Sequence, residues 1–280
     1  MEKIQINISA SKLAALIGCN PYESSFQSYV KLFNRKKQLL LQLGDVVELT
    51  DEQKLAKYVS ENKLKCNLWQ FKKCKTTGDL DKLEEKIAVQ NKITDEDKKK
   101  EFKLLIDKVV RKRFGTRHEK NVRNKVNLTR KDKIVKDEKR YMKHLFDTEK
   151  FKFYLVGKVD GADSAGVLYE IKTRRSRLFH TLRDYEKIQM YAYMFLANYK
   201  KACLIEEFRP AIDTVERDQQ EINFDSDFWK KILTRAKLAC NVFEECFERE
   251  SKKHCETQTE EGRTKIDDYV SSLMTKIASI

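Results

Sequence analysis

Apolar positions recur with two different periods along the chain, and each period predicts a different kind of element. Five segments have the spacing of one helical face, and they are residues 9–18, 24–33, 104–126, 184–199 and 226–247. Four segments are instead rich in β-branched and aromatic residues typical of strands, namely residues 153–160, 167–171, 202–208 and 214–224. The order of these elements predicts an α/β (mixed α+β) fold with one central mixed sheet flanked by helices.

The pattern weakens between residues 50 and 104, where Lys, Glu and Asp dominate and apolar residues become sparse. This stretch predicts helices with solvated faces, forming a Lys-rich helical insertion beside the core. The tail from residue 251 onward is again polar. A charge run usually marks only a solvated face, so lysine clusters of the insertion are merely candidate DNA contacts.

Composition narrows the class of partner. Lys and Arg number 58 against 44 Asp and Glu, which leaves a formal charge of +14 and favours a polyanionic partner such as nucleic acid. The alternative is a protein that is merely lysine-rich. No stretch approaches the ~18 apolar residues of a membrane span, and the first residues lack the apolar core of a signal peptide. Seven cysteines without a C-x-x-C pair indicate free thiols in a reducing, intracellular compartment, cytoplasm or nucleus.

The candidate chemistry lies on the two strands around the turn at residues 161–166, which predict a tight hairpin. Such a hairpin places Asp160 across from Glu170, and Lys172 shares the face of Glu170 because side chains alternate along a strand. Two carboxylates, with the Ile171 carbonyl as a further oxygen, suit Mg²⁺, and a lysine beside them can orient a water. The alternative is a surface ion pair on a hairpin.

Three further residues accompany this constellation. Gln189 and Tyr193 are four positions apart on one face of the helix that follows the hairpin, and Glu119 offers a carboxylate on the helix before it. Each has a plainer interpretation, since a polar helix face or a solvated glutamate explains it equally well.

Two other groups are candidates for binding phosphate. Ser9, Ser11 and Lys12 combine hydroxyls, free backbone N–H groups and a cation at a helix start, although simple N-capping by Ser9 is the alternative. Arg174 and Arg175 directly follow the strand that carries Lys172, and we expect them to contact DNA.

These residues together resemble a known family. The motifs that carry the resemblance are the opening Ser-Ala-Ser to Asn-Pro-Tyr run at residues 9–22, Gly115-x₃-Glu119, Gly157-Lys-Val-Asp160-Gly161, Glu170-Ile-Lys172-Thr173 and Gln189-x₃-Tyr193. Their order is similar to that of the YqaJ/lambda-exonuclease branch of the PD-(D/E)xK nucleases, which is related to the RecB nuclease domain. The sequence departs from the family in two ways, through its lysine-rich insertion and through the absence of the family's proline before Asp160.

The resemblance implies a restriction-endonuclease-like core at residues 105–250, N-terminal helices of the same domain at 1–49, an insertion at 50–104 and a tail at 251–280. It also implies a Mg²⁺-dependent exonuclease, with Mn²⁺ able to substitute, that degrades double-stranded DNA from an end in the 5′→3′ sense. Recombination, repair or viral DNA processing would be its setting. A single-strand annealing protein and further copies of the chain are the implied partners, with no membrane.

Individual roles also follow from the resemblance. Asp160 and Glu170 would bind metal, with Glu119 completing the shell, and Lys172 would be the catalytic lysine. Gln189 and Tyr193 would support the site or touch DNA, and Ser11 would meet a 5′-phosphate. Two other functions remain open, an endonuclease acting on structured DNA or RNA and a catalytically silent DNA-binding recombination factor.

Overall fold

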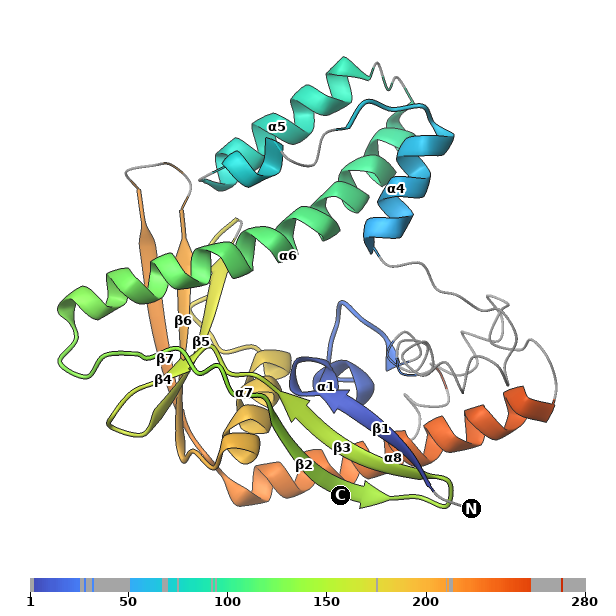
Figure 1. Cartoon of the computed structure of the whole chain (residues 1–280), viewed down its shortest axis with the longest axis vertical. Coiled ribbons are helices and arrows are strands. Elements are labelled where there is room, and N and C mark those ends of the chain that lie inside the picture. The colour runs from blue at the N-terminus through green and yellow to red at the C-terminus, as the bar shows by residue number, and fades with distance from the viewer. Residues whose placement is uncertain are drawn as a thin grey trace.

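The computed structural model of the chain describes residues 3–25, 28, 32, 51–66, 70–74, 76–91, 93, 95–174, 176–209, 211, 214–252 and 268. The mixed α/β class expected from the sequence is confirmed (Figure 1). The strands form two sheets, however, where the sequence predicted a single one. Six of the ten residues of the helix predicted over 24–33 lie outside the described residues.

The first sheet has the order β1-β3-β2, with β1 at Ile4–Ser9, β3 at Phe151–Gly157 and β2 at Tyr141–Asp147. Strand β1 runs parallel to β3, and β2 runs antiparallel to it. Neither β1 nor β2 is predicted by the sequence analysis. Alternation of Ile4, Ile6 and Ile8 was the available signal for β1, and Ile6 and Ile8 are fully buried in the main core.

The second sheet has the order β4-β5-β6-β7, with β4 at Gly161–Ala162, β5 at Val167–Arg174, β6 at Lys201–Phe208 and β7 at Glu216–Asn223. The predicted hairpin between the long strand β3 and β5 is therefore wrong, because β5 pairs with the two-residue β4 instead. Its turn lies where predicted. Strands β6 and β7 confirm the predicted strands, and β7 is the more exposed of the two.

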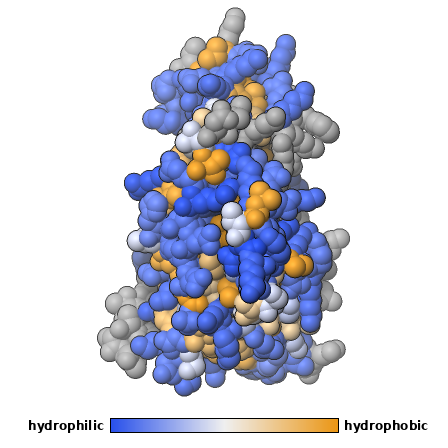
Figure 2. All heavy atoms as spheres, turned by 90° about the vertical axis from the view of Figure 1, so that its left-hand side faces the viewer, coloured by the Kyte–Doolittle hydropathy of each residue, from blue (hydrophilic) through white to orange (hydrophobic). Residues whose placement is uncertain are grey.

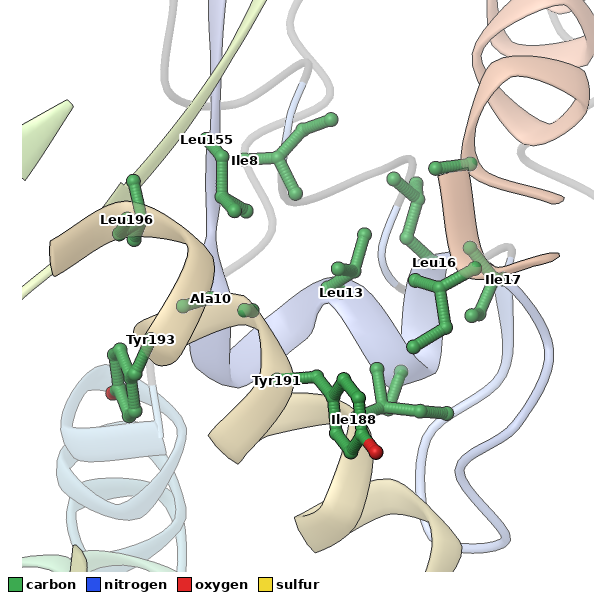
Figure 3. Close-up of a cluster of buried hydrophobic side chains, with 14 of the residues drawn as sticks. Ile8, Ala10, Leu13, Leu16, Ile17, Leu155, Ile188, Tyr191, Tyr193 and Leu196 are labelled. Atoms are coloured by element: carbon green, nitrogen blue, oxygen red, sulfur yellow. The ribbon is translucent and has the colours of Figure 1, made fainter. Parts of the chain in front are cut away.

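Three helices enclose the main core. They are α1 (Ala10–Leu16), α7 (Asp184–Ala197) and α8 (Ser226–Lys252), all close to their predicted ranges. Figure 3 shows apolar side chains of α1 and α7 in one cluster, among them Leu13 and Leu16 of α1 and Ile188 and Tyr191 of α7. Because α7 is buried over most of its surface, its polar residues have defined partners within the protein.

A separate group of helices stands above the sheets and is named here the helical lobe (Figure 1). It comprises α4 (Asp51–Glu61), a 3₁₀ helix (Gln70–Lys73), α5 (Thr77–Gln90) and the first part of α6 (Glu96–Thr129). A reciprocal capping box between Thr76 and Asp79 begins α5. The lobe has its own apolar cluster, consisting of Leu55, Tyr58, Cys74, Leu80, Ile87, Phe102, Ile106 and Val109.

Helix α6 joins this lobe to the second sheet. Its 34 residues span about 50 Å at 1.5 Å per residue. The boundary expected between residues 104 and 105 lies inside this helix, so no break in the backbone coincides with it. Division of the chain into separately folding units stays a prediction.

The surface is mainly polar where Figure 2 displays it. On that face, apolar atoms occur in small scattered groups among hydrophilic ones. Among the described residues, no helix combines the length and apolar character needed to cross a membrane.

The lobe cluster can be tested with two substitutions on the same helix. Phe102 is 0% exposed and stacks on Tyr58, whereas Leu104 is 53% exposed. We expect Phe102→Ala to lower the free energy of unfolding of the lobe by about 3–5 kcal/mol, and Leu104→Ala to change it by less than about 0.5 kcal/mol. Urea unfolding followed by circular dichroism measures both, and equal effects of the two substitutions would contradict a packed core in the lobe.

Candidate active site

Asp160 lies where the chain passes from the first sheet to the second. It directly precedes Gly161, the first residue of β4, which pairs with Tyr169 of β5. Its Oδ2 accepts a hydrogen bond of 2.8 Å from the backbone N–H of Ile171 on β5. Arg123 of α6 donates to the Asp160 backbone carbonyl oxygen at 2.9 Å. Strand β5 therefore orients this carboxylate, and α6 holds the backbone that carries it.

Glu170 is the buried member of the site, with 3% of its surface exposed. Its Oε1 accepts from Gln189 Nε2 at 2.7 Å and lies 2.5 Å from Lys172 Nζ. Its Oε2 is buried and has no hydrogen-bond partner among the described residues. An unpartnered carboxylate oxygen is costly to bury, so this atom suits a cation as its missing partner.

Helix α7 supports Glu170 through the side chain of Gln189. Gln189 and Tyr193 lie one turn apart on it, and Gln189 Nε2 is also 3.3 Å from Tyr193 Oη. Burial, followed by the charges of Glu170 and Asp160, raises the pKa of the Tyr193 phenol, which stays neutral. Space around it is limited, since a Cβ added at Gly157 would lie 2.8 Å from its ring. Tyr193 thus fixes Gln189, which in turn fixes Glu170.

The charges of the site are crowded. Burial, then the charges of Glu170 and Glu119, hold the pKa of Asp160 well above its ordinary value. The pKa of Glu119 is raised by burial and then by Glu170. Burial disfavours the Lys172 ammonium, but its attraction to Glu170 outweighs this and the pKa of Lys172 rises. Three acidic groups therefore repel one another around a single protonated lysine.

These carboxylates do not form a closed metal centre. Within the described ranges no group of three or more His, Cys, Asp or Glu side chains is arranged to hold a metal ion. Asp160 and the unpartnered Glu170 oxygen still provide two anionic donors. The backbone N–H and carbonyl of one strand residue point to the same edge of the strand. Because the Ile171 N–H donates to Asp160, the Ile171 carbonyl also faces the edge of β5 on which Asp160 lies. The donor set fits a hard cation such as Mg²⁺ that keeps several waters.

The anion site predicted at the start of α1 has an unexpected geometry. Ser9 occupies the N-cap position, as the alternative interpretation has it, but its side chain makes no cap hydrogen bond. Its hydroxyl instead lies 3.1 Å from that of Ser11. The Lys12 ammonium is 2.5 Å from the buried carboxylate of Glu23. Its charge is thus already paired within the protein.

The DNA contact expected of Arg174 stays a prediction, and the structure gives this side chain partners within the protein. Its side chain is only 11% exposed and lies between two buried carboxylates, 2.7 Å from Glu186 and in an ion pair with Glu206. Arg175, the other predicted contact, lies outside the described residues. The ion pairs of Arg174 explain its place, since a buried guanidinium requires anionic partners.

Arg123, Glu186 and Glu206 contribute to the site and are missed by the sequence analysis. Arg123 follows Glu119 by four residues on α6, so helical spacing was an available signal for it. Glu186 and Glu206 come from α7 and β6, and their meeting at Arg174 has no local signal.

Comparison with known proteins yields structural matches only. Neither a protein-family model nor a curated protein sequence matches this chain. Similar solved structures include an alkaline exonuclease from Laribacter hongkongensis, with 16% identity over 48% of this chain and 69% of that one, at a TM-score of 0.39. A phage-related exonuclease from Haemophilus somnus 129PT matches with 12% identity over 89% and 97% of the two chains, at 0.40.

Both of these structures are described as exonucleases, the class that the sequence motifs resemble. At identities and TM-scores this low, the likeness adds no weight to a functional assignment. The function must therefore be inferred from the site itself.

The raised pKa of Asp160 predicts a stability gain on its neutralisation. The native state holds this proton more tightly than the unfolded state, so stability falls as pH rises from about 4 through the raised pKa. Asp160→Asn removes this loss, and we expect its melting temperature in EDTA to exceed that of the wild type by a margin that widens between pH 5 and 8. A difference in melting temperature between the two proteins that stays constant from pH 5 to 8 would contradict the crowding of charges around Asp160.

Proposed function

We propose that this chain is a metal-dependent nuclease that hydrolyses phosphodiester bonds of DNA. The observation that carries the proposal is Glu170, buried with one oxygen held by Lys172 and Gln189 and the other unpartnered near Asp160. Such a costly arrangement has little structural purpose, since a neutral residue would be easier to bury.

Asp160 and Glu170 would hold a divalent cation, with the Ile171 carbonyl and Glu119 as further oxygen donors. Mg²⁺ is the ion expected, and Mn²⁺ should substitute for it because both accept carboxylate, carbonyl and water oxygens. When bound, the ion would supply Lewis-acid stabilisation of the charge that develops on the phosphodiester.

The protein's own groups divide the remaining work. Lys172 stays protonated because its pKa is raised, so it cannot accept a proton and instead orients the attacking water and stabilises negative charge. Gln189 donates to Glu170 and so keeps the second oxygen of that carboxylate turned away from α7. Tyr193 is too buried to bind DNA directly and acts through Gln189.

The class of substrate is inferred from the charge of the protein, and the direction of degradation from the sequence motifs. A formal charge of +14 favours a nucleic acid, and the motif resemblance favours double-stranded DNA degraded from an end, 5′→3′, in recombination or repair. Partnership with a single-strand annealing protein and assembly into oligomers remain predictions from the same resemblance. Cys19, Cys66, Cys203 and Cys240 are free thiols, and a reducing compartment stays a prediction from the cysteine pattern.

Substitutions at the three charged residues test the catalytic assignment. We expect Asp160→Asn, Glu170→Gln and Lys172→Ala to reduce Mg²⁺-dependent digestion of linear duplex DNA by about 10²–10³-fold or more. Asp227→Asn is the matched control, because this carboxylate is 79% exposed on α8 and pairs with Lys230 on the same helix. Digestion by Asp160→Asn at the wild-type rate would refute the assignment. Where digestion is lost, DNA affinity and circular dichroism of the variant show that binding and folding are intact.

The requirement for an end is tested with paired substrates. An exonuclease should degrade linear duplex and leave covalently closed circular DNA intact, whereas an endonuclease should cut both at similar rates. Comparing 5′-phosphorylated with 5′-hydroxyl ends in the same assay tests the contact predicted for Ser11. Cleavage of the circle would establish the endonuclease alternative, and digestion of an equivalent RNA would broaden the substrate class.

A further inference from the structure

One group of side chains near the site has no part in the mechanism above. Phe179, Arg183, Tyr185 and Tyr22 form a continuous stack that begins at the buried Arg174. The Phe179 ring lies between two guanidinium groups, with its centre 4.4 Å from that of Arg174 and 3.4 Å from that of Arg183. Cation–aromatic contacts of this kind hold flexible arginines in place.

Tyr22 is the exposed end of the stack. Arg183 Nη1 donates to Tyr22 Oη at 2.6 Å, and the Tyr22 ring meets the Tyr185 ring edge-on with centres 5.8 Å apart. The backbone N–H of Tyr22 also donates to Asn20 Oδ1 at 2.9 Å. Despite these three attachments, 70% of the Tyr22 surface is exposed. A rigid, exposed aromatic ring has already lost the entropy that a ligand would otherwise have to remove.

The stack is linked to the proposed catalytic centre by α7. Arg183 is the N-cap residue of this helix, and Tyr185 precedes Gln189 by four residues. One turn of about 6 Å therefore separates Tyr185 from the residue that holds Glu170. Successive nucleotides of one stacked DNA strand are about 3.4 Å apart. A strand whose cleaved phosphate lies at Glu170 therefore reaches the side chains of Tyr185 and Tyr22 within a few nucleotides.

We propose that Tyr22, held by Arg183 and Tyr185, is a stacking site for an unpaired base of the DNA strand adjacent to the cleaved phosphate. The proposal rests on the proposed nuclease function, since it assigns the occupant from the neighbouring phosphodiester chemistry. Aromatic rings beside cationic groups are the usual means of binding single-stranded nucleic acid, and they accept every base because each has a π face. The nearby Arg183 adds positive charge to the same surface.

Binding without cleavage tests this site independently of catalysis. The protein carries Asp160→Asn throughout, and its affinity for a fluorescent single-stranded oligonucleotide is measured by anisotropy in EDTA. We expect Tyr22→Ala and Tyr22→Leu each to weaken binding roughly tenfold, as for loss of one stacked base. Tyr22→Phe keeps the ring but loses the hydrogen bond from Arg183, so it should weaken binding much less. Tyr22→Leu keeps an apolar contact with Tyr185, which separates stacking from packing. Leu128→Ala is the matched control, because Leu128 is 81% exposed near the end of α6.

Abasic oligonucleotides identify the stacked position. When one base after another is removed from the DNA, affinity should fall at one position with Tyr22 and at no such position with Tyr22→Ala. Equal binding by Tyr22 and Tyr22→Ala, or equal loss in Tyr22→Phe and Tyr22→Ala, would overturn the proposal and leave the exposed ring to a protein partner or to a structural role. Absence of any DNA binding by the parent protein would overturn the proposal as well. Failure of the unsubstituted protein to digest DNA with Mg²⁺ or Mn²⁺ would instead refute the nuclease function, so the two failures are distinguishable.

Discussion

The burial of the Glu170 carboxylate in β5 is the constraint on which the candidate site depends. A charge removed from water must be compensated, and here Lys172 and Gln189 compensate only one of its two oxygens. The remaining oxygen, together with Asp160, creates a local excess of negative charge that the protein itself does not neutralise. Function and stability therefore oppose each other at this point, as they commonly do where ionisable groups are crowded.

The rest of the fold keeps these charges in place. Asp160 lies where the chain leaves one sheet and enters the other, and a backbone N–H of β5 fixes its orientation. Helix α7 approaches from the core side and carries Gln189, while α6 brings Glu119 and Arg123 from the direction of the lobe (Figure 1). Because elements distant in sequence converge here, packing in each of them affects the geometry of the carboxylates.

The two cationic side chains of β5 that pair with buried carboxylates have different consequences. Lys172 remains partly exposed beside Glu170, so it can reach a substrate. Arg174, two residues later on the same strand, is enclosed by Glu186 and Glu206 and instead anchors Phe179. Through Phe179 and Arg183 this anchor extends to the surface at Tyr22. One strand thus provides a catalytic candidate and the base of a separate binding surface.

Local pattern was sufficient to predict α7, α8, β6 and β7, and alternation along β5 placed Glu170 and Lys172 on one face. These features depend on neighbours within a few residues, and the printed sequence contains them in full. The tertiary structure alone decided that β3 and β5 belong to different sheets, that β1 and β2 flank β3, and that Arg174 is buried. Strand pairing and ion pairing join residues far apart in the chain, and their free energy depends on burial, which exists only after folding.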